Sequence, residues 1–314
     1  MKTIKPKTRI KYFFTILWIS LALVQPALSQ TYAEYYNSAL AKAQNRQYEE
    51  AIKDFDRAIK AKPDAADAYY WRGIAKAATG NRTAGISDFS KAIRYNNQYG
   101  EAYLHRGMHY NDEGNPKSAL GDLNKAVQIM PNNELAHSSR GIANANLEKH
   151  EVAIVDFTNA INIDPNNAQY YLNRGLSYRG IQNFEDAMKD FSKAIRLDSR
   201  NSKAYHNRGL CYRYLEDFEM AIRDYTQAVI LNPGDADAYF NRGLSYGKLE
   251  NHQKAIQDYS KVIKINPEDA DAYLNRGIEK IMENKKEDGC LDIVKAAELG
   301  LMRAIDVRNE FCEF

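Results

Sequence analysis

The chain has 314 residues, 44% of them hydrophobic and 27% charged, a composition typical of globular proteins with enough apolar material for a core. Its formal net charge is +2, and no cluster of basic residues follows residue 11. Nucleic-acid-binding proteins carry a clustered basic excess because phosphate contacts supply most of their affinity, so we expect no nucleic acid among the partners.

The first 29 residues have the three-part pattern of a secretory signal peptide. Five basic residues between Lys2 and Lys11 precede the apolar run Tyr12 to Val24, and the small-residue stretch Ala27 to Ser29 follows. The apolar run has 13 residues, fewer than the roughly 20 of a membrane-spanning helix, which favours a cleaved signal peptide. An uncleaved signal anchor is the alternative. Cleavage after Ser29 removes five of the 43 basic residues and leaves 38 against 41 acidic ones, a net charge of −3. This pattern predicts an exported protein without stable membrane insertion after signal removal.

Residues 30–299 form eight repeats with a period of 34 residues and no insertions. The repeats start at Tyr32, Ala66, Gly100, Glu134, Ala168, Ser202, Ala236 and Ala270. Apolar residues recur at positions 4, 8 and 11 and again at 20, 24 and 27 of each repeat, which is the spacing of one helical face. Each repeat is therefore predicted to be two amphipathic helices, and residues 300–314 are predicted to form a further short helix that caps the C-terminal end.

Several columns of the repeat have a packing reason. Position 8 is glycine in every repeat but the first, position 20 is small, and position 24 is bulky and apolar or aromatic. A glycine facing a small residue allows the two helices to approach closely. Five repeats have proline at position 32, which ends the second helix.

On these residues the chain resembles the tetratricopeptide repeat (TPR) family, whose signature has an aromatic at position 4, Gly at 8, Tyr at 11, Ala at 20, Phe or Tyr at 24 and Pro at 32. The resemblance covers about 270 residues, with the eighth repeat departing in its second half. It implies an all-α TPR solenoid, a right-handed superhelix of about eight antiparallel helix pairs plus the C-terminal capping helix. The C-terminal ending also resembles that of exported bacterial TPR proteins, which implies a periplasmic or extracellular location. One position departs from the family: position 7, usually leucine, is arginine in seven repeats.

The arginines at position 7 have a matching column, because position 23 is aspartate in all eight repeats. Positions 7 and 23 are equidistant from a turn near position 15, so in an antiparallel helix pair they face each other. We expect a repeated Arg–Asp ion pair within a hairpin or with the adjoining one. The alternative is an arginine ladder for anionic ligands.

Asparagine recurs at position 6, as Asn37, Asn173, Asn207, Asn241 and Asn275. The resemblance implies that this position faces the concave groove formed by the first helices, where an amide can bond to the backbone of an extended peptide. The alternative is that asparagine only solvates the helix surface. Positions 5 and 9 of the same helices are mostly apolar, and the residues that we expect to line the groove are Tyr36, Tyr70, Phe240 and Leu274. Packing of position 9 beneath the next repeat is the competing interpretation.

The sequence contains no Gly-rich phosphate loop, HExxH, GxSxG or CxxC motif, so it predicts a protein that is not an enzyme and has no cofactor. His105, His109 and His137 offer three imidazoles within two repeats, but nothing else supports a metal site, and we expect surface and packing histidines.

The three cysteines fall into two groups. Cys211 is at position 10, where other repeats have alanine or serine, so we expect a small buried residue. Cys290 and Cys312 lie at equal distances from residue 301, where one helix ends and the next begins, so an exported chain would join them in a disulfide, with two buried thiols as the alternative.

These features predict a binding scaffold for another protein or a peptide, held in the concave groove. The alternative is a structural or assembly component of a cell-envelope complex that binds through its convex face.

Overall fold

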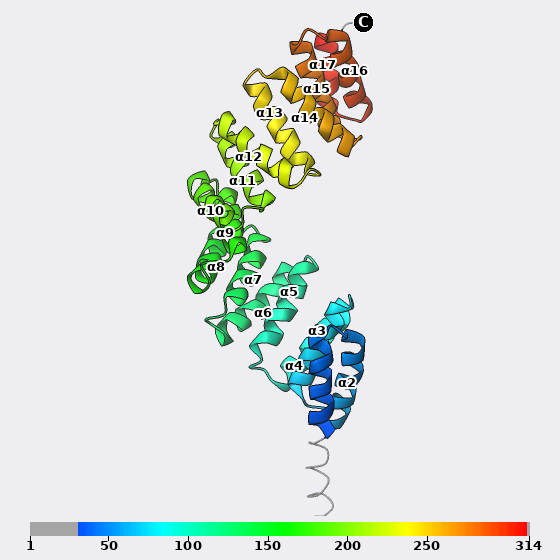
Figure 1. The fold of residues 1–314 in the computed structure, drawn as a ribbon, viewed down its shortest axis with the longest axis vertical. Helices are drawn as coiled ribbons and strands as arrows, with labels where there is room; N and C mark the ends of the chain where they lie inside the picture. Colours follow the sequence, from blue (N-terminus) through cyan, green and yellow to red (C-terminus); the bar gives the residue numbers. More distant parts are fainter. Residues whose placement is uncertain (1–30, 313–314) are drawn as a thin grey trace, which may run out of the picture. The chain divides into compact units, whose positions relative to one another are not determined.

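The computed structural model describes residues 31–312 as helices joined by short turns, with no strand among them (Figure 1). The predicted signal peptide, residues 1–29, lies outside these described residues. Between residues 31 and 312, each helix is too short or too polar to cross a membrane.

The chain divides into two compact parts, and the first comprises residues up to Leu147. Residues 31–44 are helical and form the first helix of the first repeat. The remaining helices of the N-terminal part are α2 (Tyr48–Ala61), α3 (Ala66–Ala78), α4 (Arg82–Tyr95), α5 (Gly100–Asp112), α6 (Pro116–Ile129) and α7 (Glu134–Ala145).

The C-terminal part begins at Glu148. Its helices are α8 (His150–Ile163), α9 (Ala168–Gly180), α10 (Phe184–Leu197), α11 (Ser202–Tyr214), α12 (Phe218–Leu231), α13 (Ala236–Lys248), α14 (His252–Ile265), α15 (Ala270–Met282), α16 (Lys286–Glu298) and α17 (Met302–Phe311). Within each part, consecutive helices pack against one another, so the chain advances as a row of helix pairs (Figure 1).

The helix boundaries follow the 34-residue period. The helices α3, α5, α7, α9, α11, α13 and α15 begin at the seven predicted repeat starts from Ala66 to Ala270. Position 15, in the turn that follows each first helix, has a positive φ in all eight repeats: Arg46, Gly80, Gly114, Glu148, Gln182, Glu216, Glu250 and Asn284. This left-handed residue lets the next N–H bond back to the helix end, as Asn251 N–H does to the Tyr246 carbonyl at 2.8 Å.

The core of each repeat lies between its two helices. A Cβ built on Gly175 would meet the Phe191 ring at 2.7 Å, and one built on Gly209 would meet the Tyr225 ring at 2.9 Å. Position 24 is therefore fully buried against the glycine of position 8, as the sequence predicts. Replacing these glycines would push the paired helices apart.

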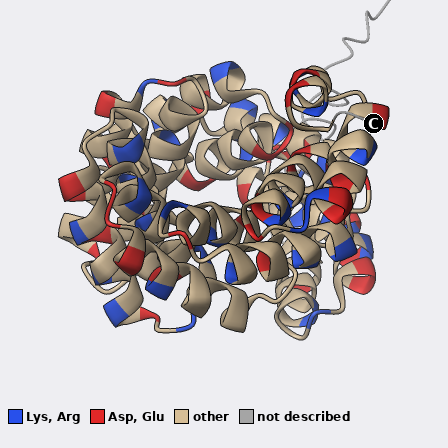
Figure 2. Ribbon diagram, turned by 90° about the horizontal axis from the view of Figure 1, so that it is seen from above, with Lys and Arg blue, Asp and Glu red and all other residues tan. Residues whose placement is uncertain are grey.

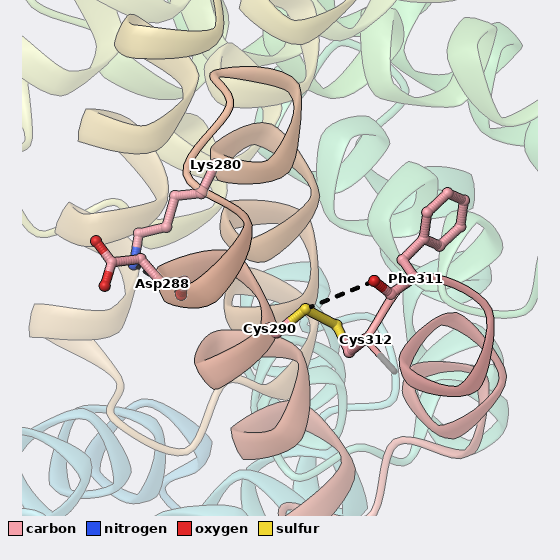
Figure 3. The surroundings of a disulfide bond; sticks show 5 residues. All are labelled: Lys280, Asp288, Cys290, Phe311 and Cys312. Atoms are coloured by element: carbon pink, nitrogen blue, oxygen red, sulfur yellow. Dashed lines mark hydrogen bonds between the residues drawn. A yellow bond between two sulfur atoms is a disulfide. The ribbon is translucent and has the colours of Figure 1, made fainter. Parts of the chain in front are cut away.

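The C-terminal end is held by a disulfide. Cys290 of α16 and Cys312, directly after α17, are bonded with their Cα atoms 5.6 Å apart (Figure 3). Both residues belong to a small core with Leu274, Ile293 and Ala304, and Ala304 is the one fully buried residue of α17. Since α17 buries so little, the disulfide is a main attachment of this helix. Cys211 is a buried free thiol, and burial raises its pKa to about 11.

Candidate functional site

The candidate binding surface is the side of the first helix of each repeat that faces away from the second helix of the same repeat. Residues two apart on a helix point in nearly opposite directions, about 200° apart. Position 8 contacts the second helix, so position 6 points away from it. We call this side the first-helix face. Charges of both signs are interspersed over the helices (Figure 2), so a general charge excess does not single out one face.

The arginine column lies between the helices rather than on the first-helix face. In α11, Arg208 donates from Nε and a terminal nitrogen to the two carboxylate oxygens of Asp224 in α12, at 2.7 and 2.8 Å. The same bidentate pair recurs at Arg72–Asp88, Arg106–Asp122, Arg174–Asp190, Arg242–Asp258 and Arg276–Asp292. The expected ion pair within the hairpin is confirmed in these six repeats.

The third nitrogen of each arginine joins neighbouring repeats. The second terminal nitrogen of Arg242 donates to the Thr226 hydroxyl of the preceding repeat at 3.0 Å, and Thr226 donates to the Ile222 carbonyl. Equivalent bonds run from Arg106 to Ser90, Arg174 to Thr158, Arg208 to Ser192 and Arg276 to Ser260. Arg72 instead donates to the Asp56 carboxylate. Sequence reasoning missed this contact, although position 25 is polar in these repeats.

The guanidinium groups also stack on the position 4 tyrosines. Arg72 lies 5.3 Å from the Tyr69 ring centroid and Arg276 lies 5.4 Å from that of Tyr273. Two nitrogens of each of these arginines bond to an aspartate, the third bonds to the preceding repeat, and a tyrosine ring covers the guanidinium plane. No nitrogen of these groups is left for a ligand. The structure therefore favours a packing role for the column over a ladder for anionic ligands.

The asparagines of α9, α11, α13 and α15 are half-buried on the first-helix face of the C-terminal part. The side-chain N–H groups of Asn207, Asn241 and Asn275 donate to the backbone carbonyl four residues earlier, at 2.7 to 2.8 Å. Asn173 instead accepts from Gln169 at 2.7 Å. The oxygen of Asn207 accepts from Arg179 of the preceding repeat at 2.7 Å. The bonds of Asn241 and Asn275 to their own helix leave the two amide oxygens available as hydrogen-bond acceptors.

The residues expected to line the groove behave in two ways. Tyr36 and Phe240 are half-buried, and Asn37 is exposed. Tyr70 and Leu274 are only 6% and 3% exposed, so these two side chains offer a partner little surface. Position 5 lies at the edge of the helix pair, and in these two repeats it packs into the core with Phe89 and with Ile293.

The three histidines serve packing. His105 and His109 stack against the Phe89 ring, with centroids 6.0 and 5.8 Å away, and burial lowers the pKa of both. The ring Nε2 of His137 lies 2.9 Å from the Pro131 carbonyl oxygen, the same bond that Tyr69 makes to Pro63 at position 4. Among the described residues, no group of three or more His, Cys, Asp or Glu side chains is placed to hold a metal ion.

The second helices carry exposed apolar side chains of their own. Val155 of α8 is 59% exposed and Ile230 of α12 is 62% exposed, whereas Lys193 of α10 is half-buried over the Tyr171 ring. An open hollow of about 450 Å³ on α10 and α11 is lined by Glu185, Met188, Lys189, Ser192, Arg196 and Tyr212.

Several of these helix pairs match known repeat families. The tetratricopeptide repeat model matches residues 168–201, 202–235 and 236–269, and a second TPR repeat model matches residues 39–80. No curated protein matches the chain.

Three solved structures illustrate the similarity. MamA is 28% identical, with 52% of this chain and 96% of that one covered at a TM-score of 0.50. YrrB, a TPR protein with an unusual peptide-binding site, is 22% identical over 60% and 97% of the two chains, with a TM-score of 0.54. PilF of Pseudomonas aeruginosa is 19% identical over 67% and 97%, with a TM-score of 0.59. The chain thus contains tetratricopeptide repeats, and its helix pairs have the fold of a TPR solenoid.

Proposed function

We propose that the protein is a non-enzymatic scaffold that binds an extended segment of a protein partner on the first-helix face of its C-terminal part. The fold itself supports protein or peptide partners, because a row of helix pairs offers a long surface without a catalytic centre. YrrB, which has the same fold, has a peptide-binding site of an unusual kind.

The observation that carries the proposal is the repeated amide at Asn173, Asn207, Asn241 and Asn275. These four side chains occupy the same position of successive first helices and lie on the side facing away from the second helices. The structure refines how they would act. One N–H of each NH2 group of Asn241 and Asn275 already bonds to its own helix. The amide oxygen and the second N–H are therefore available, and the backbone N–H and carbonyl groups of an extended peptide are the complement.

The second candidate is an envelope assembly component that binds through its second helices. The exposed Val155 and Ile230 favour it, because exposed apolar surface often marks an interaction site. Export to the periplasm or beyond belongs to both proposals and depends on residues 1–29. Sequencing the N-terminus of the mature protein tests export, with a start near Gln30 expected.

The test compares two variants of the full chain. The first-face variant carries Asn173→Ala, Asn207→Ala, Asn241→Ala and Asn275→Ala, and the second-face variant carries Val155→Ser and Ile230→Ser. Affinity purification from the native envelope and mass spectrometry identify the partner, and a synthetic peptide of its bound segment then serves for calorimetry. The scaffold proposal expects only the first-face variant to lose affinity, whereas an assembly component would lose its partner only in the second-face variant.

A further inference from the structure

The first-helix face of the N-terminal part differs from that of the C-terminal part because it is aromatic. Rings from residues 31–44, α3, the turn before α5 and α5 itself gather there, and Tyr36 and Trp71 pack in the same cluster. Tyr32 and Tyr36 stack with centroids 5.5 Å apart, and Tyr70 lies 5.2 Å from Trp71, 4.9 Å from Tyr99 and 5.7 Å from His105. Tyr70 is buried, whereas the other five rings are half-buried and keep part of their surface exposed.

A carboxylate lies among these rings. The Tyr32 hydroxyl donates to Asp67 Oδ1 at 2.9 Å, and the Ala68 backbone N–H donates to the same oxygen at 3.0 Å. Burial raises the pKa of Tyr36 to about 12, with the Asp67 charge adding to the effect, and burial also raises the pKa of Tyr99. These phenols are therefore neutral at pH 7 and present ring faces and hydroxyl groups beside a fixed negative charge.

The carboxylates of this face are not held in ion pairs among the described residues. Asp67 and Glu101, both at position 2, form no ion pair with a cationic side chain of the described N-terminal part. Lys42 and Lys76 are engaged between the helices, with Asp54 and Asp88, and Lys62 lies over the Tyr32 ring, 5.5 Å from its centroid. A cation supplied by a partner would complete the arrangement.

We propose that this aromatic face, built around Asp67 and Trp71, binds an arginine side chain of the partner protein. The inference rests on the proposed scaffold function and names the chemistry of one contact. Arginine fits better than lysine because its planar guanidinium can stack on a ring while donating to a carboxylate. The protein itself uses this combination: Arg72 stacks on Tyr69 and donates to Asp88.

Trp71 is a built-in reporter. The chain has two tryptophans, Trp18 and Trp71, and Trp18 lies in the predicted signal peptide. The mature chain, or an uncleaved chain carrying Trp18→Phe, therefore reports from this face alone. The probe is the capped peptide acetyl-Gly-Arg-Gly-Arg-Gly-amide, with two analogues in which citrulline or lysine replaces arginine. Citrulline keeps the shape of arginine but has no charge. A charge-matched control variant is Glu49→Gln, which removes an exposed carboxylate of α2.

We expect the arginine peptide to change the Trp71 emission in a saturable way and to bind about tenfold more tightly than the citrulline peptide. The lysine peptide should bind more weakly than the arginine peptide. Asp67→Asn should weaken the arginine peptide about tenfold, and Glu49→Gln should not change it. Equal binding of the arginine and citrulline peptides, or no loss with Asp67→Asn, would overturn the inference, and the peptide comparison needs no substitution at the site.

This test is independent of the asparagine column. If the arginine peptide fails while the partner still depends on the four asparagines, the inference fails and the scaffold function stands. If the partner binds the four-alanine variant as tightly as the wild type, the proposed binding on the asparagine column is wrong.

Discussion

Arg208 donates two parallel hydrogen bonds, 2.7 and 2.8 Å long, to the two carboxylate oxygens of Asp224. The carboxylate is the more buried partner, since the side chain of Asp224 is 6% exposed and that of Arg208 is 18% exposed. Removing either partner leaves a charge without its counter-ion, and the cost depends on how easily that charge reaches water.

The pair predicts an unequal response to substitution. Arg208→Leu should lower the free energy of unfolding by about 3 kcal/mol or more, because it strands a buried carboxylate. Asp224→Asn should cost less, because the guanidinium keeps Ser192 and can reach solvent. The double variant Arg208→Leu, Asp224→Asn should lose less stability than the sum of the two single variants, because it leaves no unpaired charge. Urea unfolding of the four proteins measures this cycle, and strictly additive losses would show that the pair is not coupled.

The left-handed turn residues predict a stabilising substitution. Glu250 has a φ of 56°, a conformation that glycine adopts without strain and that Gly80 and Gly114 occupy in other repeats. Glu250→Gly should raise the free energy of unfolding by about 0.5 to 1 kcal/mol, and Gly80→Glu should lower it by a similar amount. A urea midpoint that falls for Glu250→Gly would contradict this account of the turn.

Asp88 predicts a pH-dependent ion pair. Burial favours its neutral form, but the hydrogen bonds and charges of Arg72 and Lys76 outweigh burial, so the pKa of Asp88 is lowered from its usual 3.8. A lowered carboxyl pKa stabilises the fold above the unfolded-state pKa, and this contribution is lost as the pH falls through the folded-state pKa. Lys76→Gln should therefore reduce the stability by a constant amount from pH 8 to pH 5, and the difference should shrink only as the pH falls through the lowered pKa of Asp88.

The control for this titration is Lys189→Gln, which removes the exposed partner of Asp186 and should give no resolvable change at any pH. Chemical unfolding at each pH provides the measurement. A Lys76→Gln effect of the same size in a protein that also carries Asp88→Asn would rule out Asp88 as its source.

The three cysteines predict how many thiols react with a thiol reagent in the native, the unfolded and the reduced protein. The native protein should not react with a thiol reagent, because Cys211 is fully buried with a raised pKa and the other two cysteines are joined. Unfolding without a reductant should expose one thiol per chain, and unfolding after reduction should expose three. Three thiols in the unreduced, unfolded protein would show that Cys290 and Cys312 are not bonded.

The sequence predicts the helix pairs well because their signal is repeated. Glycine at position 8 and the bulky residue at position 24 specify the same close contact in repeat after repeat, and Arg208 and Asp224 could be matched by their distance from the turn. Exposure is harder to predict. Tyr70 and Phe240 share position 5, yet the first is buried and the second is half-buried. Tyr70 is surrounded by several rings, including Tyr99 and, from the next repeat, His105, whereas Phe240 contacts the Tyr259 ring of its own repeat. The aromatic face around Asp67 depends on contacts between repeats, which a single-repeat pattern does not contain.

The most direct measurement of the central claim is the dissociation constant of the partner's bound segment for the wild-type protein and for the variant with alanine at Asn173, Asn207, Asn241 and Asn275. The variant should unfold within about 0.5 kcal/mol of the wild type, because alanine is a better helix former on a partly solvated face. Each lost amide should cost about 0.5 to 1.5 kcal/mol of binding, so the four together should weaken the segment by well over tenfold. An unchanged dissociation constant in a folded variant would contradict the claim that the first-helix face holds the partner.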